Sequence, residues 1–240
     1  MVRRQAVVLA GGLGTRMLPR TERVPKILLD VAGRPFADWL LRRLAACGYD
    51  EVVLCIAHLG EQVRAAIGDG ARFGIAARWV DEGKTLRGTG GALALARAEG
   101  LLDETFLVTY GDSWLPFDYA GPLDRLRAEP RWRGVMAVFR NDAQWDASNV
   151  VLSADGARVA RYEKGVDDEA FDHIDYGATA LRREVLDDYP KDAAFGLDSV
   201  QHALAAAGAL GAHVAAERFY EIGSPAGLSD LEARLQREEE

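Results

Sequence analysis

Short apolar runs alternate with amphipathic segments along the first 140 residues, and this alternation constrains the fold more than any other feature. The run Gln5–Leu9 stops at Gly11, which is typical of a buried strand entering a loop. In the next segment, Pro35–Ala46, apolar residues recur at helical spacing after a proline in the first turn. Further strands are expected at Glu51–Ile56, Ala76–Val80, Thr105–Tyr110 and Gly134–Phe139, with helices at Glu61–Ile67, Thr89–Ala98 and Tyr119–Glu129. Strands that alternate with helices predict an α/β fold with a doubly wound, mostly parallel sheet flanked by helices.

The pattern changes after about residue 140. Two short apolar runs, Val150–Leu152 and Val159–Glu163, flank the turn Asp155-Gly156 and predict a β-hairpin. Strands are expected at Asp175–Leu181 and Arg218–Ile222, and helices around Leu197–Leu204 and at Pro225–Gln236. We therefore expect one domain over residues 1–240, Rossmann-like in its first 140 residues, with a small β-rich insertion in residues 141–240.

Composition and charge exclude several classes of protein. Hydrophobic residues make up 49% and charged residues 28% of the chain, which is typical of globular proteins rather than disordered ones. No apolar run reaches the roughly 18 residues of a membrane helix, and the run after the basic start of the chain is too short for a signal peptide. We therefore expect a cytoplasmic protein that does not bind membranes.

The net charge of −8 argues against a nucleic-acid partner, which would need a basic stripe. Cys47 and Cys55 form no CxxC motif, and we expect two reduced thiols. The four histidines lack the spacing of a zinc site.

The loop after the first strand has the composition of a phosphate-binding segment. It reads LAGGLGTRMLP over residues 9–19 and is followed by Pro25-Lys26. Glycines allow backbone N–H groups to close on phosphate oxygens. Arg16 can form a fork on two oxygens, and Lys26 adds a point charge. A dinucleotide fingerprint is excluded, because Met17 stands where the third glycine belongs.

The string GGLGTRMLPRTERVPK, residues 11–26, resembles the signature of the sugar-1-phosphate nucleotidyltransferases. Later motifs follow in the order of that family, so the resemblance covers essentially the whole chain. They are GTGGA at 88–92, YGD at 110–112, EK at 163–164, DYG at 175–177 and EIGSP at 221–225. The resemblance implies transfer of a nucleotidyl group from a nucleoside triphosphate to a sugar 1-phosphate, with release of pyrophosphate. It also implies that residues 1–140 bind the nucleotide and residues 141–240 the sugar.

The resemblance assigns roles to individual residues. Two residues depart from the family pattern: Glu221 stands where most members have aspartate, and Asp175 stands near a position where many have asparagine. GTGGA at 88–92 resembles the loop that binds the nucleobase in the family, and Glu82, shortly before it, is a further candidate. The implied catalytic residues are Arg16, Lys26, Asp112 and Lys164; those that bind nucleotide are Leu9, Ala10, Gly11, Gly12, Gly14, Thr15, Gly88, Thr89 and Gly111; those that bind sugar are Asn149, Glu163, Tyr176 and Gly177; those that bind metal are Asp112 and Glu221.

The expected chemistry needs charge neutralisation rather than a general base. The attacking group is a phosphate monoester with a second pKa of about 6, so it is mostly dianionic at neutral pH. The expected cofactor is Mg²⁺, and a homodimer is expected from the family. The string GTGGA resembles guanylyltransferases that act on mannose- or heptose-type sugar 1-phosphates, which favours GTP. UTP, dTTP or CTP with another sugar 1-phosphate stay open as alternatives, as does a non-catalytic nucleotide-sugar sensor or regulatory subunit.

Overall fold

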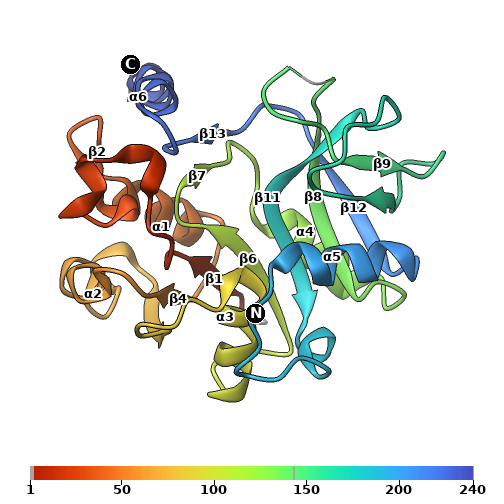
Figure 1. Ribbon diagram of the computed structural model, residues 1–240, viewed down its shortest axis with the longest axis horizontal. Helices are drawn as coiled ribbons and strands as arrows, with labels where there is room; N and C mark the ends of the chain where they lie inside the picture. The colour runs from red at the N-terminus through yellow and green to blue at the C-terminus, as the bar shows by residue number, and fades with distance from the viewer. Residues whose placement is uncertain (1–2, 143, 240) are drawn as a thin grey trace. The chain divides into compact units, whose positions relative to one another are not determined.

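The computed structural model describes residues 3–142 and 144–239 (Figure 1). The chain falls into two units that are interleaved along the sequence. The first unit comprises Met1–Leu86, Thr109–Leu115 and Phe219–Glu240, and the second comprises Arg87–Val108 and Pro116–Arg218. The chain therefore passes from one unit to the other four times.

The first unit is built on parallel strands, as the sequence predicts. Strand β1 (Gln5–Leu9) pairs in parallel with β4 (Glu51–Ile56), and β4 pairs in parallel with β5 (Ala76–Asp81). All six residues of β4 are buried, which explains why this strand reads as a continuous apolar run rather than an alternating one. The strands and the helices between them confirm the predicted α/β fold class.

Two helices connect these parallel strands. Helix α1 (Phe36–Ala46) follows Pro35 and buries one apolar face, which includes Leu40 and Leu44. It ends before Gly48, whose φ of +78° lies in the left-handed region that suits a helix C-terminus. Helix α2 (Gly60–Ile67) connects β4 to β5 and is followed by the 3₁₀ turn η4 (Ala71–Phe73).

The remaining elements of the first unit are short. Between β1 and α1 lie the 3₁₀ turns η1 (Thr15–Met17), η2 (Arg20–Glu22) and η3 (Lys26–Leu28) and the small hairpin of β2 (Asp30–Val31) and β3 (Arg34–Pro35). From later in the chain come β7 (Ser113–Trp114), β13 (Tyr220–Glu221) and α6 (Pro225–Glu239). Strands β7 and β13 pair antiparallel, so the residues before β7 lie beside the residues after β13.

The second unit contains a mixed sheet. Its long strand β11 (His173–Arg182) is antiparallel to β8 (Gly134–Arg140) and to β9 (Val150–Leu152). Strands β9 and β10 (Val159–Tyr162) form the predicted hairpin, and β8 pairs in parallel with β12 (Leu210–Ala215). This is the β-rich part of the C-terminal half that the sequence predicts.

Three helices and one 3₁₀ turn complete the second unit. Helix α5 buries Leu197, Val200 and Leu204, the apolar face expected from the sequence. Strand β6 contributes residues to both units, because the division falls after Val108. The bounds are α3 (Gly88–Ala98), α4 (Ala120–Ala128), α5 (Leu197–Ala206), η5 (Arg183–Leu186) and β6 (Thr105–Tyr110).

Strand β12 is absent from the elements that the sequence predicts. It is rich in glycine and alanine, which are depleted in strands, so its composition carries no strand signal. The small residues have a packing reason, because a Cβ at Gly211 would lie 3.1 Å from the ring of Trp132. At the end of the chain, β13 is limited to Tyr220–Glu221 and is shorter than the expected strand Arg218–Ile222.

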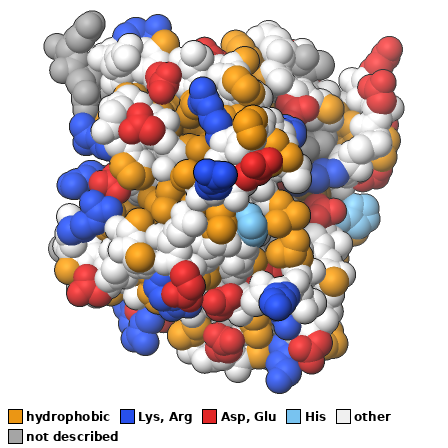
Figure 2. All heavy atoms as spheres, turned by 60° about the vertical axis from the view of Figure 1, so that its left-hand side comes forward, with side chains coloured by type: hydrophobic (Ala, Val, Ile, Leu, Met, Phe, Trp, Pro, Cys, Tyr) orange, Lys and Arg blue, Asp and Glu red, His pale blue; other side chains and the backbone are white. Residues whose placement is uncertain are grey.

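Basic side chains on the face drawn in Figure 2 are interspersed with acidic and apolar ones and form no continuous stripe. Among the residues described, no helix combines the length and the apolar character needed to cross a bilayer.

Candidate functional site

The predicted phosphate-binding loop leaves β1 in the first unit. Its start is anchored by two backbone hydrogen bonds, from Ala10 N to Cys55 O and from Gly111 N to Leu9 O, both 2.9 Å long. Gly14 has a φ of +64°, and a Cβ there would lie 2.9 Å from the Thr21 side chain, so this position requires glycine.

The middle of this loop is open. Nothing described lies within 4 Å of a Cβ built on Gly12, and both Thr15 and Arg16 are exposed. A Cβ on Gly11 would lie 2.7 Å from Oε1 of Glu82, so that buried carboxylate sits directly against the loop. The loop therefore has one accessible backbone edge and one edge covered by an acidic side chain.

Lys26 and Asp112 form an ion pair beside this loop. The Lys26 ammonium donates a hydrogen bond of 2.6 Å to Oδ2 of Asp112, and the side chains are 14% and 31% exposed. The other carboxylate oxygen of Asp112 accepts a bond of 3.1 Å from the Ser113 hydroxyl. Turn η3 positions the lysine, and the end of β6 positions the aspartate.

The C-terminal EIGSP motif lies against the same charged groups. The backbone N–H of Ile222 donates to the carbonyl of Asp112 at 2.9 Å. A Cβ on Gly223 would lie 3.0 Å from Nη2 of Arg16 and 3.4 Å from Nζ of Lys26. The structure thus brings the predicted residues Arg16, Lys26 and Asp112 together in the first unit, next to Gly223.

Glu221 is carried by β13 to the strand position opposite Ser113, one residue from Asp112. In the part of the chain that the structure describes, no group of three His, Cys, Asp or Glu side chains could hold a metal ion. Mg²⁺ commonly takes one or two carboxylates and fills its other positions with water and substrate phosphate. The carboxylates of Asp112 and Glu221 are donors of this kind, and a role in metal binding stays a prediction.

The predicted nucleobase loop, Gly88 and Thr89, begins α3 in the second unit. Its glycines have a packing role, because a Cβ on Gly88 would lie 2.6 Å from the carbonyl oxygen of Phe195. The hydroxyl of Thr89 accepts a hydrogen bond of 2.8 Å from the N–H of Leu197. This segment is held by residues 195–197, and a role in base recognition stays a prediction.

Asn149 and Gly177 meet at Asp175 in the second unit. The side-chain oxygen of Asn149 accepts a bond of 2.9 Å from the N–H of Asp175, whose own Oδ1 accepts one of 3.0 Å from the N–H of Gly177. Gly177 has a φ of +98° and lies where the pairing of β11 with β8 shifts register. Burial raises the pKa of the Asp175 carboxyl, while nearby Lys164 acts to lower it.

The ring of Tyr176 belongs to the core rather than to an open site. It is 1% exposed and packs edge-on against Phe117 with the ring centroids 5.1 Å apart. A contact between Tyr176 and a ligand would therefore come from its backbone.

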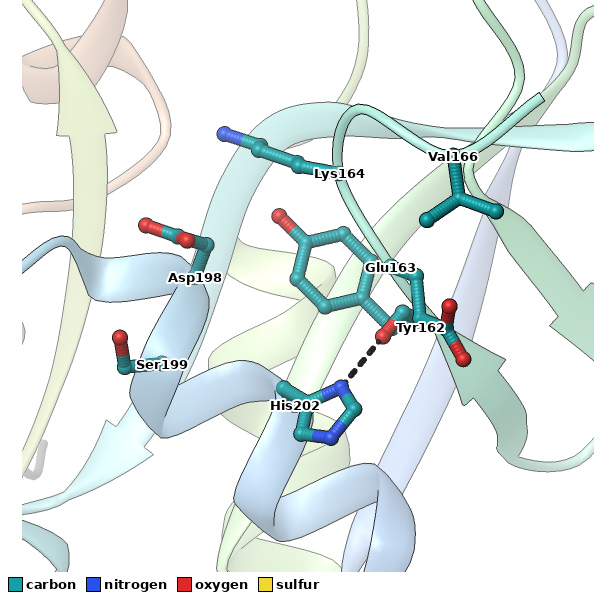
Figure 3. Close-up of a pocket in the computed structure, with 7 residues that line it drawn as sticks. All are labelled: Tyr162, Glu163, Lys164, Val166, Asp198, Ser199 and His202. Atoms are coloured by element: carbon teal, nitrogen blue, oxygen red, sulfur yellow. Dashed lines mark hydrogen bonds between the residues drawn. The ribbon is translucent and has the colours of Figure 1, made fainter.

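Glu163 and Lys164 point in different directions. The Glu163 carboxylate is held by Arg161, whose Nε lies 2.9 Å from its Oε1, and this pairing lowers the pKa of Glu163. In Figure 3 the ammonium group of Lys164 lies on the side of Asp198, away from the Glu163 carboxylate.

A cleft of about 390 Å³ opens beside Lys164 in the second unit. Helix α5 contributes side chains that sequence reasoning missed. Their one signal is the spacing of Asp198 and His202, which places two polar residues on one helix face. His202 is fixed by a bond of 2.9 Å between its Nδ1 and the carbonyl of Tyr162. The lining residues, drawn in Figure 3, are Tyr162, Glu163, Lys164, Val166, Asp198, Ser199 and His202.

Comparisons with known proteins find relatives of this chain. The family model "Nucleotidyl transferase" matches residues 5–238. Mannose-1-phosphate guanylyltransferase of Mycobacterium tuberculosis is 34% identical over 186 residues, which cover 78% of this chain and 51% of that protein. N-acetylmuramate alpha-1-phosphate uridylyltransferase of Caulobacter vibrioides is 30% identical over 241 residues, which cover 96% of each.

A solved structure has the same fold. The putative glucose-1-phosphate thymidylyltransferase from Bacillus anthracis matches with a TM-score of 0.83 at 17% identity, covering 96% of this chain and 94% of that one. The chain spans about half the length of the first curated relatives that it matches, at 51%, 53% and 54% of them.

Proposed function

Because the chain belongs to the nucleotidyl transferase family, we propose that it transfers a nucleotidyl group from a nucleoside triphosphate to a sugar 1-phosphate. The observation that carries this proposal is the meeting of Arg16, Lys26 and Asp112 beside a glycine loop with an open backbone edge. Two cations and a carboxylate next to such a loop suit a polyphosphate and its counter-ion.

The reaction balances without a general base. An oxygen of the sugar phosphate forms a bond to the α-phosphorus of the triphosphate, and the bond from that phosphorus to the pyrophosphate oxygen breaks. The nucleophile is already mostly dianionic at neutral pH, so no side chain has to remove a proton. The protein has to align two polyanions and neutralise their repulsion.

The first unit would supply the nucleotide side of this chemistry. The amides of residues 11–14 would cradle the triphosphate, and Arg16 would stabilise charge on the departing pyrophosphate. Lys26 would hold the incoming phosphate. Asp112 and Glu221 would hold Mg²⁺, which supplies charge neutralisation between the phosphate groups.

The second unit would supply the acceptor side. Lys164 would bind the phosphate of the sugar, and Asn149, Glu163 and the backbone at Tyr176 and Gly177 would contact the sugar. Asp175 supports this set, because it is bonded to both Asn149 and Gly177.

We favour GTP as the nucleotide and a mannose- or heptose-type sugar 1-phosphate as the acceptor. The buried carboxylate of Glu82 supports guanine, which presents two adjacent N–H donors on its pairing edge. Uracil presents a single donor between two carbonyl oxygens, and a carboxylate would repel those oxygens. The similarity to mannose-1-phosphate guanylyltransferase over 78% of this chain also supports this choice.

Uridylyl transfer to an amino-sugar 1-phosphate is the second candidate. It is favoured by the relative that matches along 96% of both chains, an N-acetylmuramate alpha-1-phosphate uridylyltransferase. A non-catalytic nucleotide-sugar sensor is a weaker candidate, because Arg16, Lys26, Asp112 and Lys164 are all present.

Two measurements test the proposed function. Calorimetric titration of GTP, UTP, dTTP and CTP with Mg²⁺ identifies the nucleotide without a choice of sugar. Release of pyrophosphate is then followed with mannose 1-phosphate, glucose 1-phosphate and N-acetylmuramate 1-phosphate. We expect GTP to bind most tightly and to react with mannose 1-phosphate. Nucleotide binding without turnover on any acceptor would favour the sensor.

A further inference from the structure

The cleft beside Lys164 has the size and the lining of a small polar ligand site. Its volume of about 390 Å³ lies at the lower end of the range for ligand pockets, about 300–1,000 Å³. Six of the seven lining side chains carry a polar group, and helix α5 provides Asp198, Ser199 and His202.

Glu163, the carboxylate that the family resemblance assigns to the sugar, is already engaged in this chain. Both of its oxygens accept hydrogen bonds from Arg161, at 2.9 and 3.3 Å. Its carboxylate also points away from the Lys164 ammonium, whereas the side chain of Asp198 lies on the same side as that ammonium (Figure 3). Of the two carboxylates that line the cleft, Glu163 and Asp198, the one on the side of the Lys164 ammonium is therefore Asp198.

Asp198 and Lys164 are both available to a ligand. Within residues 3–142 and 144–239, neither the carboxylate of Asp198 nor the ammonium of Lys164 forms a hydrogen bond or an ion pair, with each other or with another residue. The absence of a side chain at Gly196 makes room for this carboxylate, because a Cβ there would lie 1.9 Å from Oδ1 of Asp198. A ligand for this pair carries an anionic group for the lysine and, a short distance away, a hydrogen-bond donor for the carboxylate.

A sugar 1-phosphate has both of these groups, a phosphate and several ring hydroxyls. We infer that Asp198 accepts a hydrogen bond from a hydroxyl of the acceptor sugar while Lys164 holds its phosphate, and that Asp198 thereby selects neutral, polyhydroxylated sugar 1-phosphates. This inference rests on the proposed function and names the substrate class of its acceptor site. A sugar that carries a carboxylate, such as N-acetylmuramate, would meet a like charge at Asp198 and be disfavoured.

The test compares Asp198→Asn and Asp198→Ala with the wild type in pyrophosphate release. The acceptors are mannose 1-phosphate and glucose 1-phosphate, the 2-, 3-, 4- and 6-deoxy analogues of whichever reacts faster, and N-acetylmuramate 1-phosphate. The matched control is Asp167→Asn, which removes an exposed carboxylate that does not line the cleft. Thermal unfolding of each variant checks that the fold is kept.

We expect Asp198→Asn to raise the KM for the sugar 1-phosphate about tenfold, the scale of a hydrogen bond to a charged group, and to leave the KM for the nucleotide unchanged. For one deoxy analogue the wild type and the variant should have the same KM, because the hydroxyl that Asp198 binds is gone. The variant should also use N-acetylmuramate 1-phosphate better than the wild type does.

Three results would overturn the inference and leave the proposed function standing. They are an unchanged KM for the sugar in Asp198→Asn, a KM effect that persists with all four deoxy analogues, and a wild type that prefers N-acetylmuramate 1-phosphate. Failure of the wild type to release pyrophosphate with any nucleotide and acceptor would instead overturn the proposed function, and the inference with it.

Discussion

Lys26 and Asp112 lie 2.6 Å apart as an ion pair, although 86 residues separate them along the chain. The pair holds a predicted phosphate-binding cation against a predicted metal-binding carboxylate, so if Asp112 binds Mg²⁺ as proposed, the lysine would compete with the metal for it. Replacing Lys26 and replacing Asp112 should therefore change the Mg²⁺ concentration needed for half-maximal rate in opposite directions.

We expect Lys26→Gln to lower the Mg²⁺ concentration for half-maximal rate, because Asp112 loses its competing cation, while kcat falls. Asp112→Asn should raise that concentration and lower the rate by about 10²-fold or more, the scale for losing one electrostatic contact to a transition state. The measurement is pyrophosphate release as a function of Mg²⁺. Lys191→Gln, at an exposed lysine of the second unit, serves as the control. An identical magnesium dependence in both variants would show that the pair is structural only.

Arg16 is exposed and, among the residues that the structure describes, forms no hydrogen bond or ion pair. Arg16→Ala should therefore leave the melting temperature unchanged and lower kcat by about 10³-fold, by analogy with arginines in other phosphoryl-transfer enzymes. Arg16→Lys should restore only part of the rate, because lysine keeps the charge but loses the planar fork. Arg20→Ala removes an exposed arginine from the same loop and should react like the wild type. Equal losses in Arg16→Ala and Arg20→Ala would point to a general charge effect.

The two glycines of the phosphate loop should respond differently to alanine. Gly14→Ala places a Cβ 2.9 Å from Thr21 in a left-handed conformation, and we expect it to destabilise the fold by about 1–2 kcal/mol. Gly12→Ala meets no described atom within 4 Å, so unfolding in urea should give wild-type stability. If phosphate approaches this backbone, Gly12→Ala should nevertheless raise the KM for the nucleotide. If Gly12→Ala has the wild-type KM for the nucleotide, the backbone at Gly12 does not contact its phosphates.

The base preference should depend on Glu82. Glu82→Gln replaces one of two acceptor oxygens with a donor, and we expect the ratio of kcat/KM for GTP over UTP to fall about tenfold or more. The neighbouring Asp81→Asn is the matched control, because Asp81 is exposed, accepts a hydrogen bond from the Gly83 N–H and forms an ion pair with Arg64 at 3.7 Å. If the ratio of kcat/KM for GTP over UTP is unchanged in Glu82→Gln, the Glu82 carboxylate does not recognise the base and backbone groups must do so.

Asp175 should link stability to pH. Burial raises the pKa of its carboxyl, so the folded protein holds this proton more tightly than the unfolded chain does. The stabilising effect of that proton is complete below the unfolded pKa of about 3.9 and is lost as pH rises through the folded pKa. Asp175→Asn keeps an acceptor for the N–H of Gly177, while its amide nitrogen would replace Oδ2, which accepts from the Tyr162 hydroxyl and from Nε2 of Gln201.

We therefore expect Asp175→Asn to gain stability relative to the wild type as pH rises from 4 to 8, measured by urea unfolding at each pH. The groups that face Asp175 are Lys164, Tyr162 and Gln201, and the lysine opposes the effect of burial. A stability difference that does not vary with pH would mean that Lys164 offsets the cost of burying the charge.

The sequence predicts the α/β fold because buried strands such as β4 carry a continuous apolar run, here from Val52 to Ile56. It does not predict β12, in which Gly211 fits against the ring of Trp132 at a position where glycine gives no strand signal. In the first unit the motifs for Arg16, Lys26 and Asp112 are far apart in sequence, and the structure brings them together.

The acceptor side could be predicted less well. The ring of Tyr176 lies in the core, and no motif distinguishes a buried tyrosine from one that faces a ligand. Asp198 was missed because one aspartate on an amphipathic helix looks like any solvated residue. Asp198 becomes a candidate because Arg161 pairs with Glu163, the other carboxylate that lines the cleft. The sequence gives no sign of that pairing.

The interleaving of the two units determines how the gene for this chain could be divided. A fragment that ends at Leu86 keeps the glycine loop, Arg16 and Lys26, but lacks Asp112 and Glu221, which return from two later stretches. No single cut therefore yields a complete copy of the first unit, and two fragments of a split protein would have to reassemble before the residues predicted to bind nucleotide and metal came together. The residues proposed for the acceptor, from Asn149 to Asp198, lie by contrast in the one stretch Pro116–Arg218, so a contiguous block within it could be exchanged between relatives without dividing the first unit.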